Sequence, residues 1–252
     1  MTAATPILTA TGLRKEFRGF KAVNGVDLSI REGSIHALIG PNGAGKTTVF
    51  NLLTQFLKPT GGRVVYRGRE ITALPPADVA RLGLVRSFQI SAVFPKLTAL
   101  ANVRVALQRR AGLATQFWRS NGVLSVLDDR ARALLSDVGL DAHADTEAAD
   151  LSYGRKRALE IATTLALEPD LLLLDEPMAG MAHEDIGRVS DLIRTVAVGR
   201  TVLMVEHNLS VVADLCDHVT VLARGEVLAE GSYATVSRDP RVREAYMGSE
   251  DA

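Results

Sequence analysis

Short, largely apolar segments alternate with helical patterns along most of the chain. Three of these segments predict strands that are buried on both faces: Ser34–Ile39, Leu171–Leu174 and Thr201–Val205. A helical pattern over Thr48–Leu57 follows the first of them. Near the other end, Val219–Leu222 and Val227–Leu228 predict a closing hairpin that turns at Gly225. This alternation predicts an α/β fold built on a largely parallel sheet.

Two regions depart from the alternation. Apolar and polar residues alternate through the first thirty positions, which predicts an antiparallel β subdomain ahead of the core. Between about Leu97 and Leu140 the pattern is helical and contains no strand candidate. We therefore expect one domain over residues 7–248, with a helical subdomain inserted at residues 90–158. The ends, 1–6 and 249–252, are expected to be flexible.

Composition narrows the class of protein. The chain has 252 residues, of which 47% are hydrophobic, enough to bury a large core and to exclude disorder as its main state. Lys plus Arg and Asp plus Glu both number 29, so no excess of positive charge favours nucleic acid. The one cysteine, Cys216, excludes an intrachain disulfide and fits a reducing compartment. No apolar run approaches the roughly 20 residues of a membrane span, and no secretory signal is visible, so we expect a soluble, cytoplasmic chain.

A glycine-rich segment after the first buried strand carries the main chemical signal. It reads Gly40, Pro41, Asn42, Gly43, Ala44, Gly45, Lys46, Thr47, Thr48, which fits G-x-x-x-x-G-K-[ST] between a strand and a helix. In such a loop backbone N–H groups surround phosphate oxygens, the lysine reaches the β- and γ-phosphates, and the hydroxyl of Thr47 can bind Mg²⁺. The alternative is a glycine-rich turn with a chance Lys-Thr, which the strand–loop–helix context disfavours. We predict a nucleoside triphosphate site.

An acidic pair ends the second buried strand. Asp175 and Glu176 follow Leu171–Leu174, and the carboxyl ends of parallel strands are where ligands bind in open α/β sheets. We predict that Asp175 holds Mg²⁺ and that Glu176 is the general base acting on water. The alternative is a strand-end turn, in which Asp and Pro are common.

Five motifs together resemble those of ATP-binding cassette ATPases. They are Gly40–Thr47, Gln89, Leu151–Gly154, the pair Asp175 and Glu176, and His207, in the family's order and spacing over nearly the whole chain. The resemblance implies a P-loop NTPase (RecA-like) core with ATP and Mg²⁺ as cofactors. It implies that Gln89 touches Mg²⁺ and takes part in catalysis, that His207 contacts the γ-phosphate, and that Phe17 stacks on adenine with Val23 also at the nucleotide. For Phe17 the alternative is a buried core aromatic.

The segment Leu151–Gly154 resembles the family's signature. Independently of the resemblance, Ser152 suits an N-cap and Arg155–Leu167 a following helix, whose N-terminus is a second anion site. The family pairs two subunits head to tail, so the resemblance implies that Ser152, Tyr153 and Gly154 contact the ATP held by a partner subunit.

Departures from the common motifs narrow the subfamily. Tyr153 and Arg155 stand where the usual signature has Gly and Gln, and Met178–Met181 replaces the usual Ser-Ala-Leu-Asp. These features, with Val205–Asn208 and the tail Ala245–Gly248, resemble the ATPases of bacterial branched-chain amino acid importers. The resemblance implies a peripheral protein on the cytoplasmic face of the cell membrane. Its expected partners are transmembrane permeases, a second ATPase subunit and, indirectly, a periplasmic solute-binding protein, with no nucleic acid.

Two alternatives remain at this point. Related cassettes import urea or amides instead of branched-chain amino acids. Non-transport cassettes act on nucleic acid or ribosomes, but they usually carry two cassettes or a long coiled-coil insertion, and this sequence contains one cassette and no heptad run.

Overall fold

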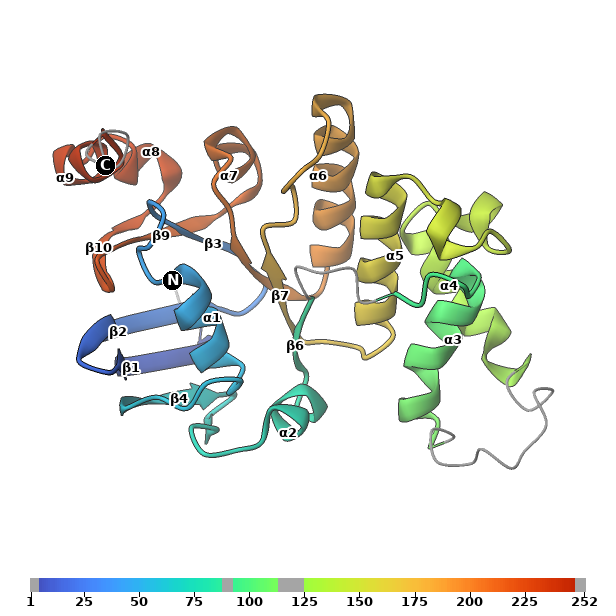
Figure 1. Cartoon of the computed structure of the whole chain (residues 1–252), viewed down its shortest axis with the longest axis horizontal. Helices are drawn as coiled ribbons and strands as arrows, with labels where there is room; N and C mark the ends of the chain where they lie inside the picture. Colours follow the sequence, from blue (N-terminus) through green and yellow to red (C-terminus); the bar gives the residue numbers. More distant parts are fainter. Residues whose placement is uncertain (1–4, 88–92, 113–124, 248–252) are drawn as a thin grey trace. The chain divides into compact units, whose positions relative to one another are not determined.

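The computed structural model describes residues 5–87, 93–112 and 125–247. The chain forms two compact units and passes between them four times (Figure 1). The first unit comprises Met1–Arg86, Asp170–Met178 and Ala197–Ala252, and the second comprises Ser87–Pro169 and Ala179–Val196.

A six-stranded sheet forms the centre of the first unit. Its strand order is β10-β9-β3-β8-β7-β6, and every neighbouring pair is parallel except β10 with β9. The strands are β3 (Ile35–Ile39), β6 (Leu84–Arg86), β7 (Leu171–Asp175), β8 (Thr201–Val205), β9 (His218–Ala223) and β10 (Glu226–Gly231). All residues of β3, β7 and β8 are buried. The predicted parallel sheet, its three central strands and the closing hairpin are therefore confirmed.

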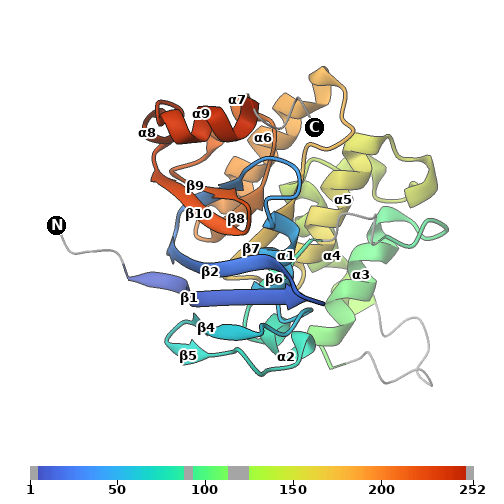
Figure 2. The same ribbon diagram turned by 60° about the vertical axis from the view of Figure 1, so that its left-hand side comes forward.

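A second, antiparallel sheet of order β2-β1-β4-β5 belongs to the same unit (Figure 2). Its strands are β1 (Pro6–Phe17), β2 (Phe20–Arg31), β4 (Gly61–Tyr66) and β5 (Arg69–Glu70). The alternating pattern of the first thirty residues predicted β1 and β2 correctly. It did not predict that β4 joins the other edge of β1, where Leu8 pairs with Tyr66 and both side chains are buried.

Helix α1 (Lys46–Leu53) belongs to the apolar core of the first unit. Its buried residues Phe50 and Leu53 share one cluster with Leu13 of β1, Leu38 of β3 and Leu173 of β7. The core therefore holds in place the helix that follows the glycine-rich loop. The other helices of this unit are α2 (Pro76–Arg81), α7 (Leu209–Leu215), α8 (Tyr233–Val236) and α9 (Pro240–Met247).

The bounds of α1 differ from the predicted Thr48–Leu57. The helix begins two residues earlier because Gly45, with φ of 101°, serves as its N-cap and leads directly into Lys46. It ends at Leu53 because Gln55 adopts a left-handed backbone with φ of 60°, which stops helical propagation.

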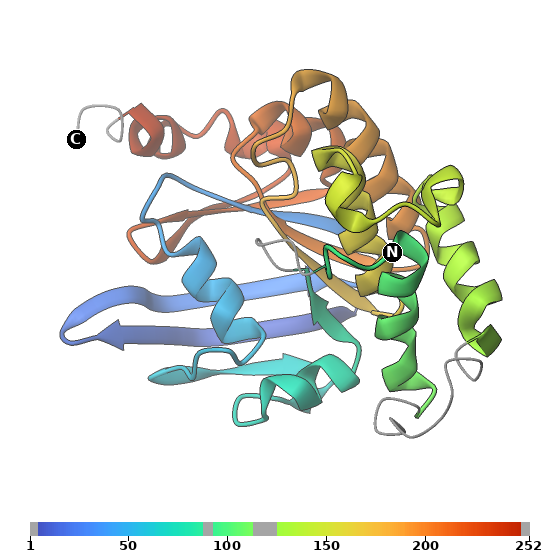
Figure 3. The ribbon, with the colours of Figure 1, turned by 45° about the vertical axis from the view of Figure 1, so that its right-hand side comes forward.

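The second unit is helical (Figure 3). Its helices are α3 (Ala99–Arg110), α4 (Asp128–Asp137), α5 (Tyr153–Leu165) and α6 (His183–Ala197, whose last residue clusters with the first unit), with short 3₁₀ turns at Asp141–His143 and Ala148–Asp150. Helix α3 contacts both α4 and α5. The expected helical character of residues 97–140 is confirmed for the part that the structure describes. The boundaries 90–158 remain a prediction.

Candidate functional site

Three glycines shape the loop before α1. Gly40, Gly43 and Gly45 have φ of 148°, 77° and 101°. A Cβ on Gly40 would lie 2.2 Å from the carbonyl oxygen of Leu222, and one on Gly45 would lie 2.6 Å from that of Ala22. Only glycine permits this backbone and these close approaches, so the pattern predicted from the sequence has a steric basis.

The loop is attached at its base to the β9–β10 turn. The N–H of Gly225 donates to the carbonyl oxygen of Ala44 at 3.0 Å, and the carbonyl oxygen of Gly225 accepts from the N–H of Asn24 at 2.8 Å. Asn24 Nδ2 also donates to Glu226 Oε1 at 2.6 Å. Sequence reasoning assigned Gly225 only to a turn. The structure gives it a second role, because it ties the loop to β2.

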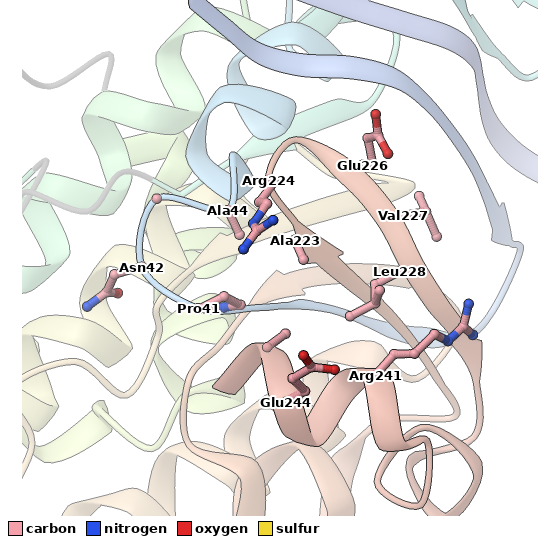
Figure 4. A pocket seen from close by; sticks show the side chains of 12 residues that line it. Pro41, Asn42, Ala44, Ala223, Arg224, Glu226, Val227, Leu228, Arg241 and Glu244 are labelled. Atoms are coloured by element: carbon pink, nitrogen blue, oxygen red, sulfur yellow. The ribbon is translucent and has the colours of Figure 1, made fainter. Parts of the chain in front are cut away.

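A cavity of about 610 Å³ lies beside the loop (Figure 4). Pro41, Asn42, Gly43 and Ala44 line it from the loop, with residues of the β9–β10 hairpin and of α9 around the rest. Lys46, Thr47, Asp175 and Glu176 do not line it. The cavity thus borders the loop without including the side chains predicted to act on phosphate.

Helix α9 also reaches the first glycine of the loop. Tyr246 is half-buried, and this partial burial raises the pKa of its phenol to about 12, while a hydrogen bond with the backbone of Gly40 acts in the opposite direction. Tyr246, which belongs to the tail that resembled a subfamily motif, therefore contacts the phosphate loop.

Lys46 is held by the loop itself. Its Nζ donates to the carbonyl oxygens of Gly40 at 2.6 Å and Pro41 at 2.9 Å. Burial lowers the pKa of the ammonium, while the negative charges of Glu176 and Asp175 act the other way. The structure therefore places Lys46 close enough to both predicted carboxylates for their charges to act on its pKa.

Asp175 is the last residue of β7 and is 1% exposed. Its Oδ2 accepts from Nη2 of Arg86 at 2.5 Å, and Nη1 of Arg86 donates to Asn51 Oδ1 at 2.5 Å. A carboxylate and a hydroxyl such as that of Thr47 are the hard oxygen ligands that suit Mg²⁺. Asp175 is already paired with a cation, Arg86, so a positive charge is favourable at this position. The residues present therefore fit the predicted Mg²⁺.

Glu176 has an unusual backbone. Its φ is 46°, and its N–H donates to the carbonyl oxygen of Val205 at 3.0 Å. A left-handed conformation costs a residue with a side chain about 1–2 kcal/mol. Such strain persists where the surroundings impose it, and it concentrates at functional sites. The sheet therefore fixes the direction in which the chain leaves β7 at the predicted base.

Glu206 is a residue of the site that sequence reasoning did not single out. It is fully buried after β8, and its carboxylate accepts three backbone N–H groups. Oε1 accepts from Met178 at 3.0 Å, and Oε2 accepts from His207 at 3.0 Å and from Asn208 at 3.1 Å. One side chain thus fixes the backbone beside Glu176 and beside His207. An acidic residue within an otherwise buried run was the signal available for it.

We expect Glu206→Gln to destabilise the fold. A carboxamide has one acceptor oxygen, so its NH₂ group would face backbone N–H donors. The expected loss is about 1.5–3 kcal/mol of unfolding free energy, the range for hydrogen bonds to charged groups. Urea unfolding measures it, with Glu70→Gln in exposed β5 as the matched control. Equal stability of the two variants would contradict this role.

The predicted signature lies at the start of α5 in the second unit. Ser152 is the N-cap residue, as expected, although its side chain makes no capping hydrogen bond. The helix spans Tyr153–Leu165 and so begins and ends two residues before the predicted bounds. The hydroxyl of Tyr153 donates to the carbonyl oxygen of Ala179 at 2.8 Å. The two departures noted in the sequence, at Tyr153 and at Met178–Met181, therefore contact each other.

A sequence model of a known family matches the chain. The family described as "ABC transporter" matches residues 23–179, a segment that includes the phosphate loop, the signature and the acidic pair. The chain belongs to this family. A second model, described as "Branched-chain amino acid ATP-binding cassette transporter", matches residues 226–252.

Individual relatives agree over almost the full length. The chain is 40% identical over 250 residues to the high-affinity branched-chain amino acid transport ATP-binding protein LivG of Salmonella typhimurium, covering 96% of this chain and 98% of that protein. The crystal structure of MJ1267 in its ADP conformation, an ATP-binding cassette of an ABC transporter, superposes with a TM-score of 0.84. It is 31% identical and covers 96% of this chain and 99% of that one. A dimeric post-hydrolysis state of the cassette MJ0796, bound to ADP and phosphate, has a TM-score of 0.74 at 25% identity, covering 90% and 98%. The predicted P-loop NTPase fold is confirmed.

The ABC assignment makes the chain a nucleotide-binding ATPase. The structure gives the following positions for the remaining predicted residues, whose roles stay predictions. Phe17 is 42% exposed at the end of β1, so the alternative of a buried core aromatic is wrong. Val23 is 1% exposed, and its contact with nucleotide stays a prediction. His207 is exposed directly after Glu206. Gln89 lies outside the described residues.

Proposed function

We propose that this chain is the ATP-hydrolysing subunit of a membrane importer for branched-chain or related amino acids. The observation that carries the proposal is the agreement of two parts of the chain. First, 96% of the chain aligns at 40% identity with a branched-chain amino acid transport ATP-binding protein. The C-terminal segment separately matches a model described by that same transport class. Relatives that import urea or amides remain the nearest alternative.

The proposed chemistry divides the site residues into two groups. Backbone N–H groups of the loop and the ammonium of Lys46 bind the phosphates, for which Lys46 exchanges its two loop carbonyls for phosphate oxygens. Thr47 and Asp175 would hold Mg²⁺, which supplies neutralising charge on the phosphates when bound. Glu176 takes the proton of the attacking water, and His207 orients the γ-phosphate.

Assembly follows from the two anion sites on one chain. The phosphate loop and the N-terminus of α5 are both suited to phosphate, and we propose that each ATP lies between the loop of one subunit and the signature of a second. The dimeric state of the related cassette MJ0796 supports this arrangement. Transmembrane permeases, with a solute-binding protein outside, complete the proposed importer at the cytoplasmic face of the cell membrane. In the described ranges no helix is both long and apolar enough to span a bilayer.

Uptake of labelled leucine tests the proposal. In the source organism, deletion of the gene for this chain is expected to reduce uptake strongly. Wild-type chain should restore it, whereas Glu176→Gln should not. Affinity purification is expected to recover two membrane permeases. Normal leucine uptake in the deletion strain, with urea uptake lost, would identify the alternative solute class. Recovery of ribosomes or nucleic acid without permeases would favour a non-transport cassette.

A further inference from the structure

Arg86 lies buried between three elements of the first unit. It is the last residue of β6, and its side chain is 9% exposed. One nitrogen donates to Asn51 of α1 and the other to Asp175 of β7, each at 2.5 Å. The guanidinium carbon also lies 5.8 Å from the ring centroid of Phe50. Both ends of the planar fork are therefore used, in a pocket that holds it from several sides.

The partner of Arg86 is the carboxylate to which the proposed function assigns Mg²⁺. A buried carboxylate is stable only if its charge is compensated and its oxygens are hydrogen-bonded. In this structure Arg86 supplies both to Oδ2 of Asp175. Mg²⁺ and Arg86 would thus both compensate the negative charge of the same carboxylate.

We propose that Arg86 is an internal counter-ion that substitutes for Mg²⁺ at Asp175 when no nucleotide is bound. It is a positioning residue: it holds the carboxylate and Asn51 in place and keeps the affinity for free Mg²⁺ low. When Mg²⁺ accompanies ATP, Arg86 would compensate only part of the charge of Asp175. The inference rests on the proposed function through the role of Asp175.

Lys46 is a second cation close to Asp175. The charge of Asp175 acts on the pKa of Lys46, yet the Lys46 ammonium donates to loop carbonyls. Removing Arg86 therefore weakens the compensation of Asp175 without abolishing it. A lysine at position 86 would keep a charge but could not bridge Asn51 and Asp175 with a planar fork.

The test compares thermal unfolding of the full chain in EDTA and in MgCl₂, without nucleotide. Arg86→Met is expected to lower Tm in EDTA and to recover part of that loss in Mg²⁺, whereas wild-type Tm should respond little. Calorimetric titration with MgCl₂ alone should show affinity raised about tenfold, the effect of removing one charged hydrogen bond that competes for the carboxylate. As the matched control, Arg104→Met breaks the half-buried pair with Asp128 in the second unit and should lower Tm equally in both buffers.

Two further variants keep the test decisive. Arg86→Met with Asp175→Asn removes both charges, so it should be more stable in EDTA than Arg86→Met and should lose the Mg²⁺ response. Arg86→Lys, which retains the charge, should fold even if Arg86→Met does not, with an intermediate response. An equal Mg²⁺ shift in wild type and in the Arg86 variants, or a double variant no more stable than the single one, would overturn the proposal. Because no ATP is present, that failure would leave the proposed transport function intact, which leucine uptake tests separately.

Discussion

Glu176→Gln is expected to slow ATP turnover by roughly 10²–10⁴, the contribution of a general base, while ATP affinity changes by no more than about a few-fold. The substitution keeps the shape of the side chain and removes its basicity. The phosphates are held by Lys46 and the loop amides, so binding does not depend on this carboxylate. Backbone φ at Glu176 is set by the sheet and the hydrogen bond to Val205, which the variant retains.

Single-turnover hydrolysis and nucleotide affinity separate these two effects. With hydrolysis stalled, ATP should hold two variant chains together, and light scattering should give a mass about twice 27.0 kDa. Asp175→Asn is the contrasting variant: it should weaken binding and its Mg²⁺ dependence together, because its proposed role is to hold the ion. Wild-type turnover by Glu176→Gln would show that another group is the base. A monomer at saturating ATP would contradict the proposed pairing.

Lys46→Ala is expected to weaken ATP binding at least about tenfold, since one charged hydrogen bond in a partly desolvated site contributes about 1.5–3 kcal/mol. The ammonium is already partly buried, which lowers its pKa. Phosphate charge stabilises the protonated form of the ammonium. We therefore expect that a solvent-exposed cation would not replace it equally well. Removing it also deletes the hydrogen bonds to the carbonyl oxygens of Gly40 and Pro41.

Isothermal titration with a non-hydrolysable ATP analogue measures the loss. Lys58→Ala is the matched control, because Lys58 is an exposed lysine of the same unit and should leave affinity unchanged. Circular dichroism on both variants confirms that the fold is retained. Equal affinity of Lys46→Ala and wild type would mean that the glycine-rich loop is not the phosphate site.

The sequence by itself determined the features that depend on neighbours along the chain. Buried parallel strands such as Leu171–Asp175 are continuous apolar runs, and the N-terminal strands alternate with period two. The phosphate loop was predictable because glycines at fixed spacing permit one backbone path. Helix ends were harder to predict. Helix α1 ends where Gln55 adopts a left-handed backbone, and no local sequence pattern indicated that conformation.

Only the tertiary structure decided the contacts that position the site. Arg86 and Asp175 are 89 residues apart, Met178 and Glu206 are 28 apart, and Tyr153 and Ala179 are 26 apart. A hydrogen bond requires its two atoms to lie within about 3.2 Å. Many different intervening sequences can bring two residues that close, so the local pattern does not identify the partners. The sequence therefore specified which side chains carry the chemistry. The packing of α1 and the two sheets around one core specified which buried groups hold those side chains in place.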